Sequence, residues 1–155
     1  MNRFRVEAIP TEVAQYVRAN GKSPVYGFPA HKEVAAGRAP CRHCLQLIRT
    51  QREDLLLFTY DPFQESKARP LPGPVYLHAD GCARYSEEKT FPDAYKGRPL
   101  TFSAYGAERN LVKEMLLTDG EEETAANQLF AIPEVEYVHV RSTEAGCYLF
   151  RLERA

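Results

Sequence analysis

Short stretches in which apolar and polar residues alternate, or in which apolar residues run together, recur along the chain and predict β-strands. Leu55 to Tyr60 is such an apolar run, and the Asp61-Pro62 pair stops it. The polar segment from Ser142 to Ala145 predicts a hairpin turn between the last two strands. In all, strands are predicted over residues 3–8, 55–60, 74–79, 100–105, 111–117, 135–141 and 146–152.

A first helix is predicted over residues 12–19, where apolar residues lie three or four positions apart. Thr11 can cap its start and Asn20-Gly21 ends it. Residues 21–40 then read as a long irregular connection, in which residues 30–36 could form a helical turn. The apolar face of the helix consists of Val13, Tyr16 and Val17.

A second helix is predicted over residues 121–131. It starts with three glutamates, and carboxylates suit the positive end of the helix dipole. Pro133 follows its end. Its inner face consists of Ala125, Ala126, Leu129 and Phe130.

The order of these elements favours an α+β fold with a mainly antiparallel sheet and two or three helices, because most strands follow one another through hairpins or irregular loops. The sequence leaves the curvature of the sheet open. A length of 155 residues predicts a single domain over residues 1–155, large enough to fold without a metal or a disulfide. The predicted core contains Leu56, Phe58, Val75, Leu77, Val138, Val140, Tyr148 and Phe150.

The charge of the chain is nearly balanced, with 20 basic and 21 acidic residues and a net charge of -1. A nucleic-acid partner is not expected, since such binders show a basic excess. No apolar stretch approaches the ~20 residues that cross a bilayer, and the first ten residues contain no secretory signal. These patterns predict a cytoplasmic protein without a membrane partner, in which the four cysteines are free thiols.

Cysteine and histidine residues gather in three short segments, and the first two together suggest a metal site. Cys41 and Cys44 form a C-x-x-C pair, and His78 and Cys82 follow about thirty residues later. Zinc sites reuse this two-residue spacing because both sulfurs then reach one ion. The four residues are therefore the candidate ligands of a zinc ion, provided that the turn at 78–82 folds back toward residues 41–44.

Two other interpretations of the same residues stay open. The cysteines can be ordinary buried or half-buried thiols. Alternatively, His43 lies inside the C-x-x-C pair and could lower the pKa of a thiol, as in dithiol redox proteins. In thioredoxin-like redox proteins the pair lies at the start of a helix within a βαβ unit, and the sequence shows no such unit.

The C-terminal hairpin is a second candidate site. Tyr137, His139 and Arg141 alternate with Val138 and Val140, so they share one face of the strand. Pairing of Arg141 with Cys147 across the turn would place His139 opposite Leu149. Guanidinium groups bind carboxylates and phosphates, and histidine can transfer a proton near neutral pH. A pocket for a small anionic ligand is therefore predicted, with the polar residues Arg42, His43, His78, His139 and Arg141. The alternative is a solvent-facing polar surface.

Three segments resemble one bacterial family: PCRHCL at 40–45, GPVYLHADGCARY at 73–85 and YVHVRSTEAGCYLFRLER at 137–154. The family is known as domain of unknown function 1203, and the resemblance runs from about residue 38 to the end. It implies a bacterial protein of about this length. It carries no activity and no catalytic residues over to this chain.

Two classes of function follow from these observations. The first is a small-molecule-binding domain or enzyme with a Cys/His/Arg pocket for an anionic ligand. The second is a non-catalytic interaction module with a structural zinc site. The sequence does not decide whether the protein is an enzyme, nor its oligomeric state, and it contains no P-loop, GxGxxG, GxSxG or HExxH motif.

Overall fold

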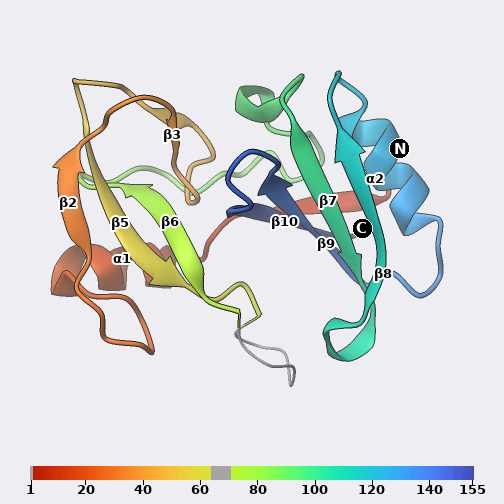
Figure 1. The fold of residues 1–155 in the computed structure, drawn as a ribbon, viewed down its shortest axis with the longest axis horizontal. Helices are drawn as coiled ribbons and strands as arrows, with labels where there is room; N and C mark the ends of the chain where they lie inside the picture. The colour runs from red at the N-terminus through yellow and green to blue at the C-terminus, as the bar shows by residue number, and fades with distance from the viewer. Residues whose placement is uncertain (1, 64–70) are drawn as a thin grey trace. The chain divides into compact units, whose positions relative to one another are not determined.

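The structure, a computed structural model, describes residues 2–63 and 71–155 (Figure 1). The chain divides into two compact units, each assembled from separate segments. Unit 1 consists of residues 1–7, 63–70 and 86–155, and unit 2 consists of residues 8–62 and 71–85. The fold class is α+β as predicted, and all strand ladders among the described residues are antiparallel. That residues 1–155 form one domain stays a prediction.

Unit 1 is built on a five-stranded sheet with the strand order β1-β10-β9-β7-β8. The helix α2 contacts its two edge strands, β1 and β8. Every predicted strand of this unit and the second predicted helix are present, with ends within two residues of the predicted ones. The bounds are β1 Phe4–Glu7, β7 Leu100–Tyr105, β8 Leu111–Leu117, α2 Glu122–Phe130, β9 Tyr137–Ser142 and β10 Tyr148–Arg154, with 3-10 turns at Asp93–Tyr95 and Ala107–Arg109.

One face of this sheet carries the apolar core of unit 1. Phe150 lies at its centre and is fully buried. The rings of Phe91 and Tyr95 pack on it, with centroid distances of 5.4 and 5.2 Å. The predicted inner face of α2 is buried in full. The core positions predicted for β9, Val138 and Val140, are also buried, although their neighbours Tyr137 and His139 are buried too.

Tyr148 is the one residue of the predicted core that is not buried. The register between β9 and β10 shifts between Tyr148 and Phe150, which is a β-bulge. A bulge adds a residue to one strand and so interrupts the alternation of faces. As a result, Tyr148 packs against His139, 5.2 Å between ring centroids, rather than beside Phe150.

Unit 2 contains a three-stranded sheet of order β2-β5-β6 and a small two-stranded sheet, β3-β4. The prediction of a helical turn at residues 30–36 is wrong, because β2 occupies this segment and pairs with β5. All four residues of β2 are exposed, so its side chains show no alternation that a sequence pattern could reveal. The bounds are α1 Thr11–Asn20, β2 His31–Val34, β3 Ala39–Pro40, β4 Leu47–Ile48, β5 Asp54–Tyr60 and β6 Gly73–His78.

The helix α1 matches its prediction except in two details. Pro10 rather than Thr11 occupies the capping position, and the Thr11 hydroxyl contacts a histidine instead. Tyr16 is 43% exposed, so the buried face is formed by Ala14 and Val17. Gly21 ends the helix in the left-handed conformation, with φ at 60°, as the Asn-Gly pair predicts.

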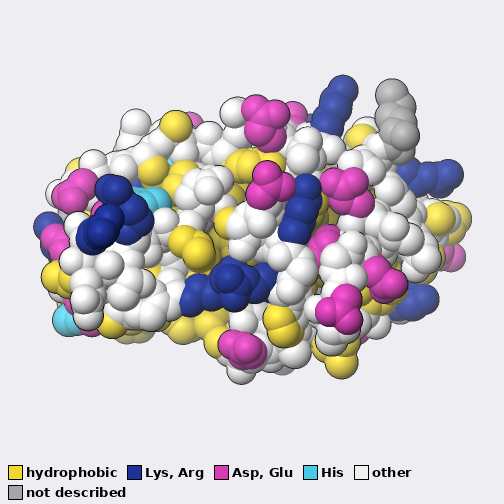
Figure 2. Space-filling model, turned by 90° about the horizontal axis from the view of Figure 1, so that it is seen from above, with side chains coloured by type: hydrophobic (Ala, Val, Ile, Leu, Met, Phe, Trp, Pro, Cys, Tyr) yellow, Lys and Arg dark blue, Asp and Glu magenta, His cyan; other side chains and the backbone are white. Residues whose placement is uncertain are grey.

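Charged side chains of both signs are interspersed over the face drawn in Figure 2, in keeping with the balanced composition. No helix in the described part of the chain has the length and apolar character needed to cross a membrane.

We predict that Phe150→Ala lowers the free energy of unfolding by about 3–5 kcal/mol, because it leaves a cavity among the rings of Phe91 and Tyr95. Urea denaturation followed by circular dichroism measures the change. Leu116→Ala is the matched control, since Leu116 is 70% exposed on β8 and its loss should cost about 0.5 kcal/mol or less. Equal effects of the two substitutions would show that Phe150 is not a core residue.

Candidate metal centre

The turn that carries Cys41 and Cys44 connects β3 to β4 and is closed by two main-chain hydrogen bonds of its own. The Cys41 N–H donates to the Gln46 carbonyl at 2.9 Å, and the Leu45 N–H donates to the Cys41 carbonyl at 3.0 Å. Leu45 has a φ of 57°, a left-handed conformation that is uncommon outside glycine and asparagine, and it is fully buried. The backbone thus turns sharply directly after Cys44.

This turn is attached to the edge of β6. Cys41 forms an isolated parallel bridge with Tyr76, and the Arg42 N–H donates to the Tyr76 carbonyl at 3.0 Å. His78 ends β6 two residues later, and its N–H donates to the Cys41 sulfur at 3.4 Å. The attachment therefore places the C-x-x-C pair beside His78.

Residues 79–85 return along the same turn and bring Cys82 to it. The Tyr85 N–H donates to the His43 carbonyl at 2.9 Å, and Gly81 has a φ of 102°, which favours glycine. The 78–82 segment folds back toward residues 41–44, as the candidate site requires. The predicted proximity of the two segments is confirmed.

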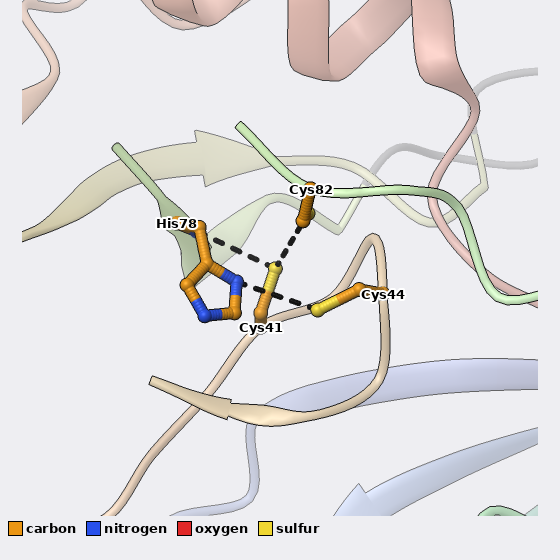
Figure 3. Close-up of side chains that lie close together, drawn as sticks. All are labelled: Cys41, Cys44, His78 and Cys82. Carbon is orange, nitrogen blue, oxygen red and sulfur yellow. Dashed lines mark hydrogen bonds between the residues drawn. The ribbon is translucent and has the colours of Figure 1, made fainter. Parts of the chain in front are cut away.

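The four ligand atoms of Cys41, Cys44, His78 and Cys82 all lie within 4.8 Å of one another. The three sulfurs and the imidazole point toward one another (Figure 3). The Cys41 and Cys82 sulfurs are 3.8 Å apart, and His78 Nδ1 is 3.3 Å from the Cys44 sulfur. A disulfide would need ~2.0 Å between sulfurs, and all four cysteines of the chain are free thiols. The arrangement can hold one ion between three sulfurs and one nitrogen.

The other ring nitrogen of His78 faces a carboxylate. His78 Nε2 lies 3.6 Å from Glu53 Oε2. Arg49 holds that carboxylate, since its N–H donates to it at 2.7 Å and its Nε lies at 3.2 Å. The Arg49 guanidinium and N–H also lower the pKa of Glu53. A carboxylate at Nε2 favours the tautomer that leaves Nδ1 as a metal ligand.

Two further side chains contact the sulfur of Cys82. Arg18 Nη2 donates to it at 3.3 Å and His43 Nδ1 lies 3.2 Å from it. Arg18 belongs to α1, and its contact depends on how that helix packs. Neither Arg18 nor Glu53 could be identified from the sequence, since no motif or spacing links them to the cysteines.

The close contact of these groups shifts their pKa values in opposite directions. Hydrogen bonds to Cys41 and Cys82 raise the pKa of His78 to about 10. Hydrogen bonds from Cys41 and Cys44 lower the pKa of Cys82, while hydrogen bonding to Cys41 and Cys82 raises the pKa of Cys44. The cluster therefore combines a readily ionised thiol with groups that retain protons, and a bound cation would replace those protons.

The residues of the predicted anion pocket lie in both units, so the pocket as a whole stays a prediction. Arg42, His43 and His78 belong to unit 2, whereas His139 and Arg141 belong to unit 1. Arg42 is buried, donates to the Pro40 carbonyl at 2.7 Å and lies over the Tyr76 ring. Arg141 donates to Ser103 and to Glu114, at 3.2 and 3.0 Å. Both guanidinium groups thus already have protein partners.

The predicted register of the C-terminal hairpin is wrong. Arg141 lies opposite Tyr148 rather than Cys147, and His139 lies opposite Arg151 rather than Leu149. Cys147 belongs to the turn, where its sulfur contacts the Ala145 carbonyl at 3.7 Å. The hairpin turn is one residue longer than predicted, and the bulge in β10 increases the offset from one residue at Arg141 to two at His139.

His139 is 2% exposed and surrounded by aromatic rings. The ring centroids of Phe63, Tyr105, Tyr137 and Tyr148 lie 4.7 to 5.3 Å from its own. Burial, with the nearby charges of Arg151, Arg141 and Arg109, lowers the pKa of His139 to about 3. The imidazole is therefore neutral near pH 7, which argues against its predicted role in proton transfer there.

We predict that acid destabilises the protein through His139. Its pKa is about 3 in the folded state, against an ordinary value of 6.5, so the unfolded chain binds the proton first. The free energy of unfolding should fall by up to about 1.4 kcal/mol per pH unit as the pH drops from 6.5 toward 3. Urea denaturation between pH 4 and 8 measures the slope. His139→Leu should have a shallower slope than the wild type, and parallel curves would refute the assignment.

Comparison with known proteins assigns the chain to a family. Residues 38–154 match the family described as protein of unknown function (DUF1203). No curated protein and no solved structure matches the chain significantly. The match covers all four residues of the metal centre and both strands of the C-terminal hairpin. Since it covers most of the sequence, the chain belongs to the DUF1203 family.

Proposed function

We propose that this protein binds one Zn²⁺ through Cys41, Cys44, His78 and Cys82, and that the ion is structural. The observation that carries the proposal is the convergence of four ligand atoms, from two separate segments, within 4.8 Å. Cys41 is buried, and Cys44, His78 and Cys82 are half-buried. Ion binding would thus take place in a largely preformed site.

The donor set and its spacing favour zinc. Soft thiolate sulfurs with one imidazole nitrogen suit Zn²⁺, whereas oxygen ligands would suit Mg²⁺ or Ca²⁺. Two sulfurs bound at ~2.3 Å to one tetrahedral zinc lie ~3.8 Å apart. The Cys41 and Cys82 sulfurs are separated by this distance, 3.8 Å.

Four protein ligands favour a structural role over a catalytic one. Catalytic zinc sites keep one coordination position for water or substrate, whereas four protein ligands complete the tetrahedron. The ion would cross-link the β3–β4 turn, the end of β6 and the loop that follows it. The function supported best is therefore that of a structural zinc site which holds unit 2 together, and this favours the non-catalytic interaction module over the enzyme.

Dithiol chemistry is less well supported by the same residues. The C-x-x-C pair lies in a turn between two strands, and no helix begins there in the described chain. The short sulfur–sulfur contact joins Cys41 to Cys82, not to Cys44. As part of the proposal, the protein resides in the cytoplasm, where the thiols stay reduced and able to bind the metal.

The first test is the metal content of the purified protein. We expect about one zinc per chain by elemental analysis, given four ligands for one tetrahedral ion. Cys41→Ser and Cys82→Ser should remove most of it, since each deletes one ligand. Cys147→Ser is the matched control, because Cys147 belongs to unit 1 and is not one of the four candidate ligands. A wild-type protein that contains no zinc and takes up none when zinc is supplied would refute the proposal.

The second test is the effect of metal removal on stability. An ion that binds only the folded state adds about 2.7 kcal/mol to the free energy of unfolding when free zinc is 100 times its Kd. We therefore expect a chelator to lower the unfolding midpoint in urea and added zinc to restore it. Cys147→Ser should respond as the wild type does, and Cys44→Ser should not respond. A zinc-loaded wild type with an unchanged midpoint after chelation would show that the ion is not structural.

A further inference from the structure

Of the four candidate ligands, Cys82 is the one with the weakest backbone support. Cys41 forms a β-bridge, His78 belongs to a strand, and Cys44 lies in a hydrogen-bonded turn. Cys82 lies in the loop from residue 79 to residue 85, outside every helix and strand, and is half-buried. The orientation of its sulfur therefore depends on side-chain contacts.

Arg18 supplies one of these contacts from the last turn of α1. Its Nη2 donates to the Cys82 sulfur at 3.3 Å and its Nε donates to the His78 carbonyl at 3.1 Å. The two donors belong to one planar guanidinium, so the contact fixes the sulfur relative to the end of β6. A single side chain of α1 thus touches two of the four candidate ligand residues.

His43 supplies a second contact to the Cys82 sulfur and also contacts the first turn of α1. It is 1% exposed, and both of its ring nitrogens have partners. Nδ1 lies 3.2 Å from the Cys82 sulfur and Nε2 lies 3.1 Å from the Thr11 hydroxyl in the first turn of α1. Both ends of α1 are therefore linked to the same sulfur.

The contact with Arg18 would offset the negative charge of the proposed zinc centre. Three thiolates and a neutral imidazole around Zn²⁺ leave a net charge of about -1, and burying an unpaired charge is costly. The Arg18 guanidinium lies against one of the thiolates and can neutralise this charge. Partners outside the ligand shell typically change metal affinity by about 10–100-fold.

We propose that Arg18 and His43 are positioning residues of the zinc centre and that they make the docking of α1 depend on the ion. The proposal rests on the proposed function. Zinc bound by Cys82 holds the sulfur in reach of Arg18 and His43, which hold the two ends of α1. Loss of the ion frees Cys82 and loosens the helix.

Zinc affinity, measured by competition with a chromophoric chelator, tests the first half of the proposal. Arg18→Gln and His43→Gln should each weaken zinc binding about 10–100-fold. Arg18→Lys should lie in between, because it keeps the charge but loses the planar fork. Arg52→Gln is the matched control, because Arg52 is an exposed arginine of unit 2 that bonds, among the described residues, through its backbone N–H. Cobalt substituted for zinc should give the wild-type spectrum in Arg18→Gln, since the four ligands are unchanged.

Hydrogen exchange tests the second half. Chelation of the wild type should speed amide exchange in Thr11–Asn20, while α2 in unit 1 serves as the internal control. Zinc-loaded Arg18→Gln and His43→Gln should show the same faster exchange in α1. Having two variants covers the case in which one of them does not fold.

The outcomes separate this inference from the proposed function. If the wild type binds zinc and both variants keep its affinity and its exchange in α1, the inference fails and the zinc site stands. If the wild type binds no zinc, both fail. Equal loss of protection in α1 and α2 would indicate global destabilisation and would also overturn the inference.

Discussion

The attachment of the Cys41–Cys44 turn to the edge of β6 is the contact on which the candidate metal centre depends. A parallel bridge between Cys41 and Tyr76 makes this attachment, with the Arg42 N–H donating to the Tyr76 carbonyl. This bridge places the turn beside Tyr76, two residues before His78 at the end of the strand. Because the chain leaves β6 at that point and returns along the turn, Cys82 joins the group as well. One edge-strand contact therefore assembles ligands that are up to forty-one residues apart.

Unit 1 and unit 2 are stabilised by different means. Unit 1 has a continuous sheet, a helix on one face and a core of large aromatic rings around Phe150. Unit 2 distributes fewer strand residues over two small sheets, and β2 is exposed along its whole length. Small folds with little apolar core often use a metal ion as a cross-link. The proposed zinc ion would lie in the unit that has the smaller sheets.

The surroundings of His78 in unit 2 and of His139 in unit 1 favour opposite protonation states. In unit 2 the imidazole of His78 lies among thiols and opposite Glu53, an environment that favours its charged form or a bound cation. In unit 1 the imidazole of His139 lies among four aromatic rings and near three arginines, an environment that favours its neutral form. The same side chain thus serves as a candidate ligand in one unit and as a packing residue in the other.

Most helices and strands could be predicted from the sequence, because alternation and helical spacing reflect local backbone geometry. The strands at 100–105 and 111–117 have the predicted ends, and both helices lie where they were predicted. The C-x-x-C spacing and the later His78 and Cys82 also identified all four residues of the cluster. Local pattern could not reveal β2, whose residues are exposed on both faces, or the bulge that moves Tyr148 to the other side of β10. Tertiary contacts bring Arg18 and Glu53 to the cluster, whereas His139 belongs to unit 1. These contacts depend on the packing of distant segments, and such packing produces no periodic pattern in the sequence.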